Sequence, residues 1–280
     1  MNLQEGIEKL FSEQTATWRR LRDGVSQLDN LRTKHFSWGD DVGVSLQFNP
    51  SRIVSTAANV DAAAIGQRPC FLCEDNRPHE QKGITFLGKY LILCNPFPIL
   101  QRHLTIPLFS HVPQRIRKKV GDMLALAEAL PDYIVFYNGP EAGASAPDHF
   151  HLQAGLKSPV LLAGDNELRG CLVLESPSIE EMEARFEDVY HYLRSRQPEK
   201  DEPLLNVIAF VEDGKYVLHL FPRKAHRPRQ YFADAARQLL VSPGALDMAG
   251  LIITVREEDF NGITKNDVED IYSQVSMPII

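Results

Sequence analysis

The chain has 280 residues, of which 44% are hydrophobic and 24% are charged, a composition that can bury one large core or two smaller ones. Its net charge of -7 argues against a general affinity for nucleic acid, because such affinity requires an excess of Lys and Arg to neutralise phosphates. Residues 1–31 interleave apolar residues with Glu, Gln, Arg and Asp. We therefore expect neither a signal peptide nor a membrane span, and we expect a cytoplasmic protein without nucleic-acid or membrane partners.

The first quarter of the chain predicts helices followed by strands. Apolar residues recur at helical spacing from Ile7 to Thr33, which predicts one or two amphipathic helices that pack on the body of the protein. Alternating apolar and polar residues between Val42 and Ala58 predict strands. Arg68-Pro69 then leads into a turn that carries Cys70 and Cys73.

The middle of the chain alternates between strand and helix patterns. Two apolar runs, at residues 90–95 and 103–107, flank a Pro-rich turn and predict neighbouring strands. The periodicity of residues 112–130 predicts a helix that Pro131 ends. Residues 133–137 predict a further strand, which runs through a loop into the segment His149-Phe-His-Leu-Gln153.

A second set of strands and helices begins after about residue 159. The predicted strands lie at residues 171–174, 205–211, 216–221 and 250–255, and the predicted helices at 179–196, 233–240 and 265–275. These elements predict an α+β fold in two halves of similar size, residues 1–158 and 159–280.

The segment 149–153 carries the candidate catalytic chemistry. In a strand, His149, His151 and Gln153 would project from one face, with like-facing neighbours about 6.6 Å apart. A neutral imidazole, with an unperturbed pKa near about 6.5, is a competent nucleophile towards phosphorus, and Gln153 could hold a non-bridging oxygen. The preceding loop contains Gly139, Gly143 and Ser145, and such loops can point backbone N–H groups at an anion. The alternative is a histidine that satisfies a hydrogen bond in the core.

The spacing of Cys70 and Cys73 is typical of two thiolates that bind zinc, and a tetrahedral site needs two further ligands. His149 is a natural third ligand, and His111 could complete a Cys2His2 set. His103 competes with His111 for the last position. A reduced cysteine pair without metal is the alternative to a zinc site.

These motifs together resemble one family. The run Tyr137-Asn-Gly-Pro-Glu-Ala-Gly-Ala-Ser-Ala-Pro-Asp-His-Phe-His-Leu-Gln153 resembles the H-x-H-x-Q signature of the galactose-1-phosphate uridylyltransferase and diadenosine tetraphosphate phosphorylase branch of the histidine-triad (HIT-like) superfamily. Three further segments resemble parts of the uridylyltransferases: Cys70-Phe-Leu-Cys73 with Asn76 and Arg77, Asn95-Pro-Phe-Pro-Ile-Leu100, and Leu104-Thr-Ile-Pro107 followed by His111.

The resemblance implies a HIT-like antiparallel sheet with helices, in two HIT-like halves of which the second is degenerate. It assigns His149 to a structural zinc, His151 to the nucleophile and Gln153 to the transferred phosphate. Asn138 and Ser145 match phosphate-contacting positions of the family. Together with Gly143 of the loop and the basic residues Arg77 and Arg223, they are the expected substrate-binding residues. The expected metal ligands are Cys70, Cys73, His111 and His149.

The expected activity is that of a nucleotidyltransferase or nucleotide phosphorylase that acts on a nucleotide sugar or dinucleoside polyphosphate through a nucleotidyl-histidine intermediate. Inorganic phosphate or a sugar phosphate is the expected acceptor. The basic cluster Arg223–Arg229, which stands out in an acidic chain, is a candidate site for the acceptor phosphate, and a solvated loop is the alternative. Two other functions stay open: a nucleotide hydrolase of the HIT type and a catalytically silent nucleotide-binding module.

Overall fold

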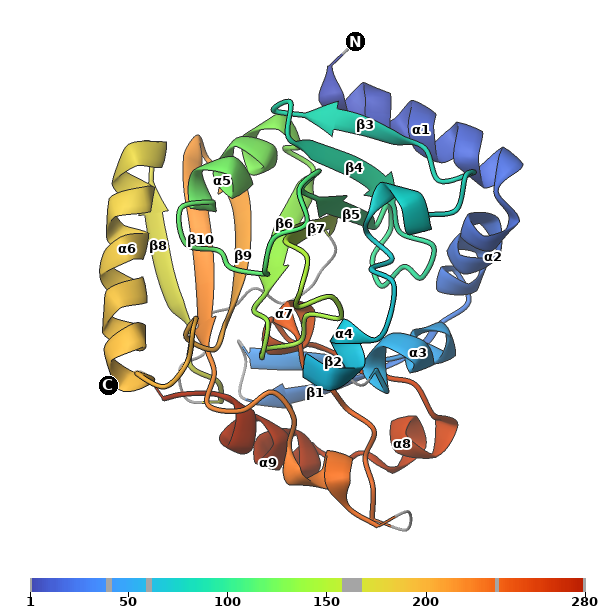
Figure 1. Cartoon of the computed structure of the whole chain (residues 1–280). Helices are drawn as coiled ribbons and strands as arrows, with labels where there is room; N and C mark the ends of the chain where they lie inside the picture. The colour runs from blue at the N-terminus through green and yellow to red at the C-terminus, as the bar shows by residue number, and fades with distance from the viewer. Residues whose placement is uncertain (1, 39–41, 59–61, 158–167, 235–236, 279–280) are drawn as a thin grey trace.

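An antiparallel sheet of eight strands forms the centre of the molecule (Figure 1). The structure is a computed structural model that describes residues 2–38, 42–58, 62–157, 168–234 and 237–278. In order across the sheet, the strands are β3 (Gly83–Phe86), β4 (Tyr90–Cys94), β5 (Leu104–Pro107), β7 (His151–Leu156), β6 (Tyr133–Asn138), β9 (Leu205–Glu212), β10 (Lys215–Pro222) and β8 (Leu172–Ser176). The predicted α+β class is confirmed, and each strand predicted in this sheet is present within a few residues of its expected bounds.

The sheet is continuous through both predicted halves. Strand β6 pairs with β9, so that Val135 lies opposite Ala209 and Asn138 opposite Asn206. The strands before residue 158 and those after it therefore share one set of backbone hydrogen bonds. The division of the chain into 1–158 and 159–280 stays a prediction.

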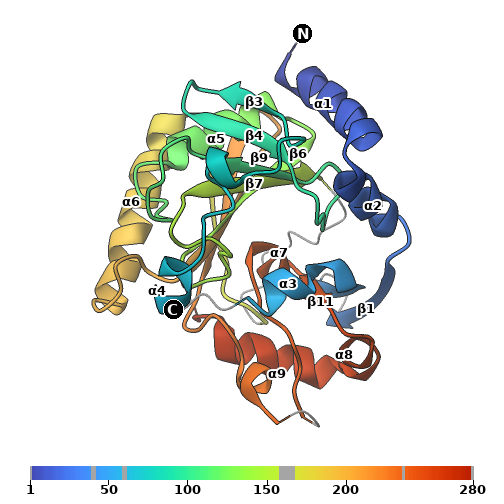
Figure 2. The same cartoon turned by 45° about the vertical axis from the view of Figure 1, so that its right-hand side comes forward.

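A smaller sheet lies on one side of the large one (Figures 1 and 2). It consists of β1 (Arg32–Trp38), β2 (Val42–Phe48) and β11 (Leu251–Thr254), with β11 parallel to β2. Val44 and Leu46 of β2 pack in one buried cluster with Ile252 of β11 and with Phe136 and Ile208 of the large sheet. This cluster joins the first and last parts of the chain.

Helices cover both sides of this two-sheet core. On one side lie α1 (Leu3–Thr17), α2 (Arg19–Leu28), α5 (Val120–Ala129) and α6 (Ile179–Arg196), and beside the smaller sheet lie α7 (Ala245–Met248), α8 (Glu257–Gly262) and α9 (Lys265–Val275). Short helical segments complete the chain: η1 (Pro50–Arg52), α3 (Ile53–Thr56), α4 (Ala62–Gly66), η2 (Glu74–Asn76) and η3 (Arg229–Phe232). Among the described residues, no helix is long and apolar enough to span a membrane.

Capping and periodicity explain why α6 and α9 have the predicted bounds. Helix α6 buries Met182, Phe186, Tyr190 and Leu193, which recur at the helical period, and the hydroxyl of Ser178 accepts from the first turn. Helix α9 begins with a capping box in which Thr264 and Asp267 bond each other's backbone N–H groups.

Three predicted elements are wrong in part. Residues 50–56, predicted as strand, form η1 and α3, in which Pro50 occupies the first helical turn. The helix predicted from residue 112 begins only at Val120, because the backbone of residues 112–114 bonds the loop before β7 instead of forming a helical turn. The helix predicted at 233–240 is absent from the described part of that segment, where η3 ends at Phe232; residues 235–236 lie outside the described residues.

The buried His219 of β10 provides a pH test of this packing. Its ring lies against Phe210 and Phe221, and burial is the main cause that lowers the pKa of His219 to about 4. Between pH 6.5 and 4 the unfolded chain binds a proton at this position that the folded chain does not, so the stability that His219 contributes falls as the pH falls through that window.

We therefore expect His219→Leu to become more stable relative to wild type on acidification. The free energies of unfolding should diverge by about 1.4 kcal/mol per pH unit below pH 6.5. Urea unfolding at pH 7.5, 6 and 5 measures this difference, with the exposed His191→Leu as the matched control. A constant difference across the three pH values would show that His219 titrates normally in the folded protein.

Candidate functional site

A cavity of about 690 Å³ lies at the start of β7. Five residues predicted from the sequence line it: Asn138, Gly143, Ser145, His151 and Gln153. His149 precedes β7 rather than lying within it, so the predicted shared strand face is correct only for His151 and Gln153. Phe150 and Leu152 are buried in the core, as their alternation predicts.

The ring of His151 is neutral and has one nitrogen available. Its Nδ1 lies 2.9 Å from the carbonyl oxygen of His149, and because a carbonyl only accepts, Nδ1 carries the hydrogen. The second nitrogen, Nε2, therefore has a lone pair. Burial lowers the pKa of His151 to about 4, against the opposing effect of the hydrogen bond to His149. At neutral pH the cavity thus contains an unprotonated imidazole nitrogen.

The fully buried Gln114 holds the backbone of His151 in place. The ladder between β6 and β7 ends at the pair Phe136 and Gln153, and beyond it the amide of Gln114 takes the place of a strand partner. Gln114 Nε2 donates to the carbonyls of Asn138 (2.9 Å) and His151 (3.0 Å), and Gln114 Oε1 accepts from the His151 N–H (2.8 Å). The sequence did not reveal this residue, because it lies in a segment whose periodicity predicts helix.

A buried carboxyl supports the same segment. Glu202 accepts from the Ile116 N–H at 2.6 Å and from the Tyr137 hydroxyl, and the Tyr137 hydroxyl also contacts the Gln114 carbonyl. Burial raises the pKa of Glu202 to about 7. Glu202 lies in a charged linker, so nothing in the sequence distinguished it from the exposed residues around it.

The loop between β6 and β7 is shaped by glycine. Gly143 has a φ of +102°, a conformation that favours glycine, and a Cβ there would lie 2.9 Å from the Cα of Gly244. Asn138 at the start of the loop accepts from Asn206 (2.9 Å) and from the Ala245 N–H (2.7 Å) through Oδ1. The start and the middle of the loop that carries Ser145 into the cavity are therefore held in place.

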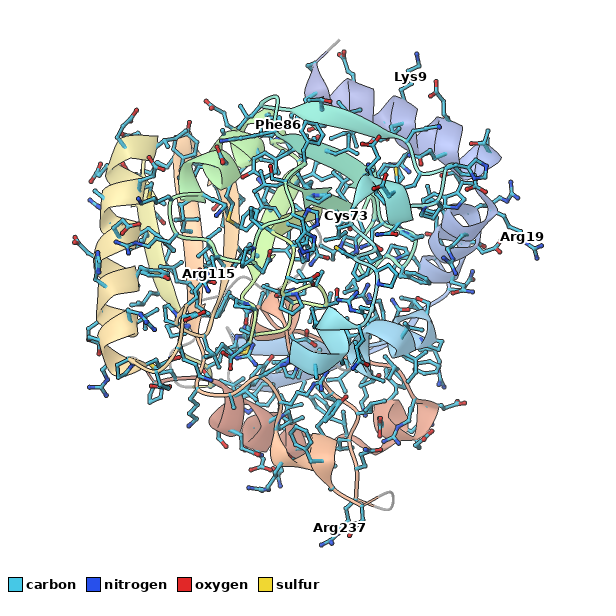
Figure 3. All side chains as sticks on the ribbon, viewed as in Figure 1. Lys9, Arg19, Cys73, Phe86, Arg115 and Arg237 are labelled. Atoms are coloured by element: carbon cyan, nitrogen blue, oxygen red, sulfur yellow. The ribbon has the colours of Figure 1, made fainter. Side chains whose placement is uncertain are left out.

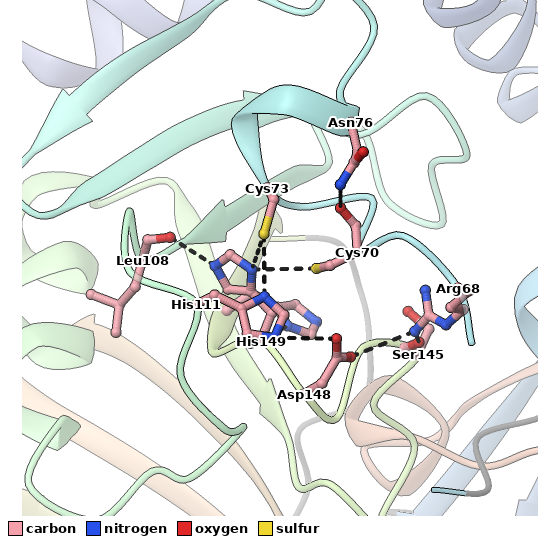
Figure 4. A network of polar contacts seen from close by, with 10 residues as sticks. Arg68, Cys70, Cys73, Asn76, Leu108, His111, Ser145, Asp148 and His149 are labelled. Atoms are coloured by element: carbon pink, nitrogen blue, oxygen red, sulfur yellow. Dashed lines mark hydrogen bonds and ion pairs between the residues drawn. The ribbon is translucent and has the colours of Figure 1, made fainter. Parts of the chain in front are cut away.

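The four predicted metal ligands meet beside this cavity (Figure 4). The ligand atoms of Cys70, Cys73, His111 and His149 lie within 4.8 Å of one another. Cys73 Sγ is 3.2 Å from His111 Nδ1, and Cys70 Sγ is 3.4 Å from His149 Nδ1. Tetrahedral zinc bonds of ordinary length require sulfur and nitrogen ligands about 3.5 Å apart. The cluster can therefore hold a metal ion. Figure 3 shows that Cys73 lies near the centre of the molecule.

The hydrogen-bond partners of the cluster agree with a metal-binding role. Burial raises the pKa of Cys73 because it disfavours the thiolate, and the neighbouring Cys70 raises it further. His149 Nε2 donates to the Leu108 carbonyl at 2.8 Å, which leaves Nδ1 for the cluster. His103, the competing ligand, does not belong to this cluster: its Nε2 lies 3.0 Å from Gln153 Oε1 instead.

Asp148 links the cluster to the cavity. Its carboxylate lies 3.5 Å from His111 Nε2 and 3.6 Å from Arg68, and Arg68 donates to the Ser145 carbonyl at 2.9 Å (Figure 4). A carboxylate behind a metal-binding histidine orients the ring and raises its basicity.

We expect Asp148→Ala to lower the affinity for zinc by about 10- to 100-fold, because His111 loses the partner that orients it. Competition with a chromophoric chelator measures the affinity. The exposed Asp234→Ala is the matched control, since Asp234 lies at the surface, where it pairs with Arg237. An unchanged affinity in Asp148→Ala would show that the contact does not support the ligand.

The cavity wall is cationic. Arg20, Arg52, Arg68 and Arg227 line it, and the described residues of its wall include no Asp or Glu. His226 also lines the cavity but is neutral, because burial and the nearby arginines lower its pKa to about 3. In a chain of net charge -7, this concentration of guanidinium groups is a local feature that favours an anionic ligand. The sequence did not reveal the set, because its members are far apart in the chain.

The prediction that Arg223 binds substrate is wrong. Arg223 is fully buried and does not line the cavity. Its guanidinium donates to the side chain of Asn206 and to four carbonyl oxygens, those of Pro243, Ala225, His226 and Val275. Of the predicted basic cluster, His226 and Arg227 reach the cavity instead. Arg77 also lies outside the cavity wall, at the end of η2.

Because Arg223 satisfies so many buried acceptors, we expect Arg223→Met to destabilise the protein by about 3 to 5 kcal/mol. Denaturant unfolding measures the loss. The exposed Arg229→Ala, which removes a surface ion pair with Asp270, should cost under about 1 kcal/mol. Equal, small losses in both variants would contradict a structural role for Arg223.

Comparisons with known proteins agree with this architecture. Residues 10–156, more than half of the chain, match the model of a family described as Domain of unknown function (DUF4922). Three similar solved structures are of yeast Ap4A phosphorylase Apa2. The first has a TM-score of 0.60 at 17% identity and covers 93% of this chain and 97% of that chain. The complex with AMP has a TM-score of 0.59 at 19% identity and covers 93% of this chain and 96% of that chain. The complex with Ap4A has a TM-score of 0.63 at 18% identity and covers 98% of both chains. The search of curated proteins found no match.

At this level of identity, the likeness establishes the fold. It confirms the HIT-like fold expected from the sequence, which the chain shares with yeast Ap4A phosphorylase Apa2. The match extends over nearly the whole chain, so it includes the smaller sheet and the C-terminal helices as well as the strands around His151.

Proposed function

The chain belongs to the family described as Domain of unknown function (DUF4922), and from this premise and the geometry around His151 we propose that it is a nucleotidyltransferase. We propose that it acts on a dinucleoside polyphosphate or nucleotide sugar and passes the nucleotidyl group to phosphate or a sugar phosphate. The fold shared with yeast Ap4A phosphorylase favours phosphorolysis of a dinucleoside polyphosphate.

One observation carries the proposal: His151, whose Nε2 is unprotonated, lines a cavity that is also lined by arginines. The nucleophile is neutral and its other nitrogen is bound to a carbonyl, while the wall attracts anions. A phosphoanhydride is the substrate class that needs both features, since its phosphorus is an electrophile surrounded by negative charge.

In the first half-reaction, His151 Nε2 attacks the α-phosphorus and forms a P–N bond. The bond from that phosphorus to the bridging oxygen breaks, and the remaining phosphate chain leaves with the electron pair. The ring then carries a positive charge, which the Nδ1–H bond to the His149 carbonyl stabilises. In the second half-reaction, an oxygen of the acceptor attacks the same phosphorus, the P–N bond breaks, and His151 returns to its neutral form.

The charge that develops on phosphorus oxygens needs donors in fixed positions. Gln153 follows His151 by two residues in β7 and lines the same cavity, and the loop at Gly143 and Ser145 closes its other side. Arg68 and Arg52 supply positive charge from the wall. Groups held before the reaction begins stabilise the transition state without the cost of reorganisation.

We propose that Cys70, Cys73, His111 and His149 hold a structural zinc ion. When bound, zinc would fix the positions of these four side chains and would not contact the substrate. Because the His149 carbonyl also accepts from His151 Nδ1, the residue that anchors the metal also orients the nucleophile.

Product analysis tests the proposed function. The protein is incubated with diadenosine tetraphosphate, and separately with a panel of nucleotide sugars, in each case without an acceptor, with inorganic phosphate or with a sugar phosphate. Products that require phosphate identify a phosphorylase, and products that require a sugar phosphate identify a transferase. Mononucleotide release that needs neither would identify a hydrolase, and binding without turnover would identify a silent binding module.

A further inference from the structure

His103 is a fully buried histidine outside the metal cluster and outside the proposed reaction. It lies one residue before β5, and both of its ring nitrogens have partners. The backbone N–H of Ile99 donates to His103 Nδ1 at 3.0 Å. Because Nδ1 accepts, a neutral ring must carry its hydrogen on Nε2. The tautomer of His103 is therefore set by a backbone group that can only donate.

This tautomer determines how the amide of Gln153 is turned. His103 Nε2 lies 3.0 Å from Gln153 Oε1, so the Nε2–H donates to the amide oxygen. The NH2 group of Gln153 then points the other way. An amide without such a partner could present either its oxygen or its nitrogen to a ligand.

We propose that His103 is a positioning residue that holds Gln153 with its NH2 group, a hydrogen-bond donor, towards the phosphate-binding cavity. This inference rests on the proposed function, in which Gln153 contacts a phosphate oxygen. The opposite orientation would place a carbonyl oxygen against the negative charge of the substrate and repel it.

The surroundings of His103 keep this arrangement constant. Burial, with a further contribution from Arg52, lowers the pKa of His103 to about 3, so the ring stays neutral above pH 5. Its ring also packs against Phe136, with centroids 5.6 Å apart. The carbonyl of His103 accepts from the Asn95 N–H at 2.9 Å, which ties the turn between β4 and β5 to the same residue.

Other polar side chains of the cavity wall near Gln153 are also held by hydrogen bonds. Thr105 lies opposite Gln153 in the register of β5 and β7, and Asn95 donates to the Thr105 hydroxyl at 3.0 Å. Asn95, Thr105 and Gln153 all line the cavity. His103 therefore sits behind a row of polar groups and orients the one nearest to His151 in the chain.

Two substitutions of His103 by residues with amide side chains test the roles of its two ring nitrogens separately. In His103→Gln the side-chain nitrogen can take the position of Nε2 and keep the donor to Gln153. In His103→Asn the side-chain oxygen can take the position of Nδ1, but no donor reaches Gln153. We expect His103→Asn to slow covalent labelling by radiolabelled diadenosine tetraphosphate at least about tenfold, and His103→Gln to stay within about threefold of wild type. Equal loss in both variants would overturn the proposal.

A double-mutant cycle separates positioning from folding. In a Gln153→Leu background, which has no amide to orient, His103→Asn should cause no further loss of labelling, while its effect on thermal stability should persist. Independent, additive losses of labelling would show that His103 acts only on the fold.

Nitrogen NMR of histidine-labelled protein tests the orientation without any substrate. The proposal predicts that His103 is the neutral tautomer with hydrogen on Nε2 from pH 5 to 8, assigned by the loss of its signals in His103→Gln. A hydrogen on Nδ1 would overturn the proposal. If wild-type protein takes no label, the proposed function fails, and this spectrum still decides how His103 and Gln153 are arranged.

Discussion

We expect His151→Ala to abolish the proposed covalent nucleotidyl intermediate and to retain the proposed metal ion. We expect labelling below about one thousandth of wild type, because the substitution removes the attacking nitrogen, while Nε2 of His226, the other histidine among the described residues of the cavity wall, lies 3.0 Å from the Ser242 hydroxyl. Metal content and the affinity for AMP should stay close to wild type, since the ring faces the cavity and none of its atoms belongs to the metal cluster.

The measurement is nucleotide label that is stable to base and labile to acid, the behaviour of a phosphoramidate. The exposed His79→Ala is the matched control and should label as wild type does. Retention of label in His151→Ala would falsify the assignment of the nucleophile, and full turnover in that variant would contradict a histidine intermediate altogether.

We expect His149→Ala to show the opposite pattern, in which metal and stability are lost first and activity follows. Three remaining ligands bind zinc more weakly, and the free energy of metal binding is also free energy of folding. The variant also leaves the Leu108 carbonyl without its buried donor. We expect a loss of at least about 3 kcal/mol in the free energy of unfolding and less than about a tenth of an equivalent of zinc after metal-replete expression.

Elemental analysis and thermal unfolding, with and without a chelator, measure these effects. Cys171→Ala is the matched control, because Cys171 is a buried cysteine outside the metal cluster. It should keep its metal. A full equivalent of zinc in purified His149→Ala, or wild-type protein without metal after replete expression, would contradict the proposed site.

Local patterns explain why much of the site could be predicted. Cys70 and Cys73 are close in sequence, and His151 and Gln153 lie on one strand, so their spacing already fixes much of their geometry. Helices α6 and α9 could be predicted because their caps and apolar periods lie within the segment itself. The choice of His111 over His103 required the fold, since both histidines flank the same strand.

Features that depend on distant contacts could not be predicted. Arg20, Arg52 and Arg227 reach one cavity only because α2, η1 and the C-terminal segment converge there. The role of Arg223 could not be predicted, because the sequence of a basic segment does not show whether its side chains face solvent or donate to buried carbonyls. Gln114 lies in a segment predicted as helix but is not helical, because its amide bonds two strands that the local sequence does not contain.

The most direct test of the central claim is to find the atom that carries the nucleotide. Wild-type protein is incubated with diadenosine tetraphosphate in the absence of phosphate, digested under basic conditions, and analysed by tandem mass spectrometry. We expect one adenylyl group, on His151 within the peptide that contains residues 149–153. The addition of phosphate should remove this group and yield ADP. An unmodified His151 in protein that turns over the substrate, or an adenylyl group on any other residue, would contradict the account.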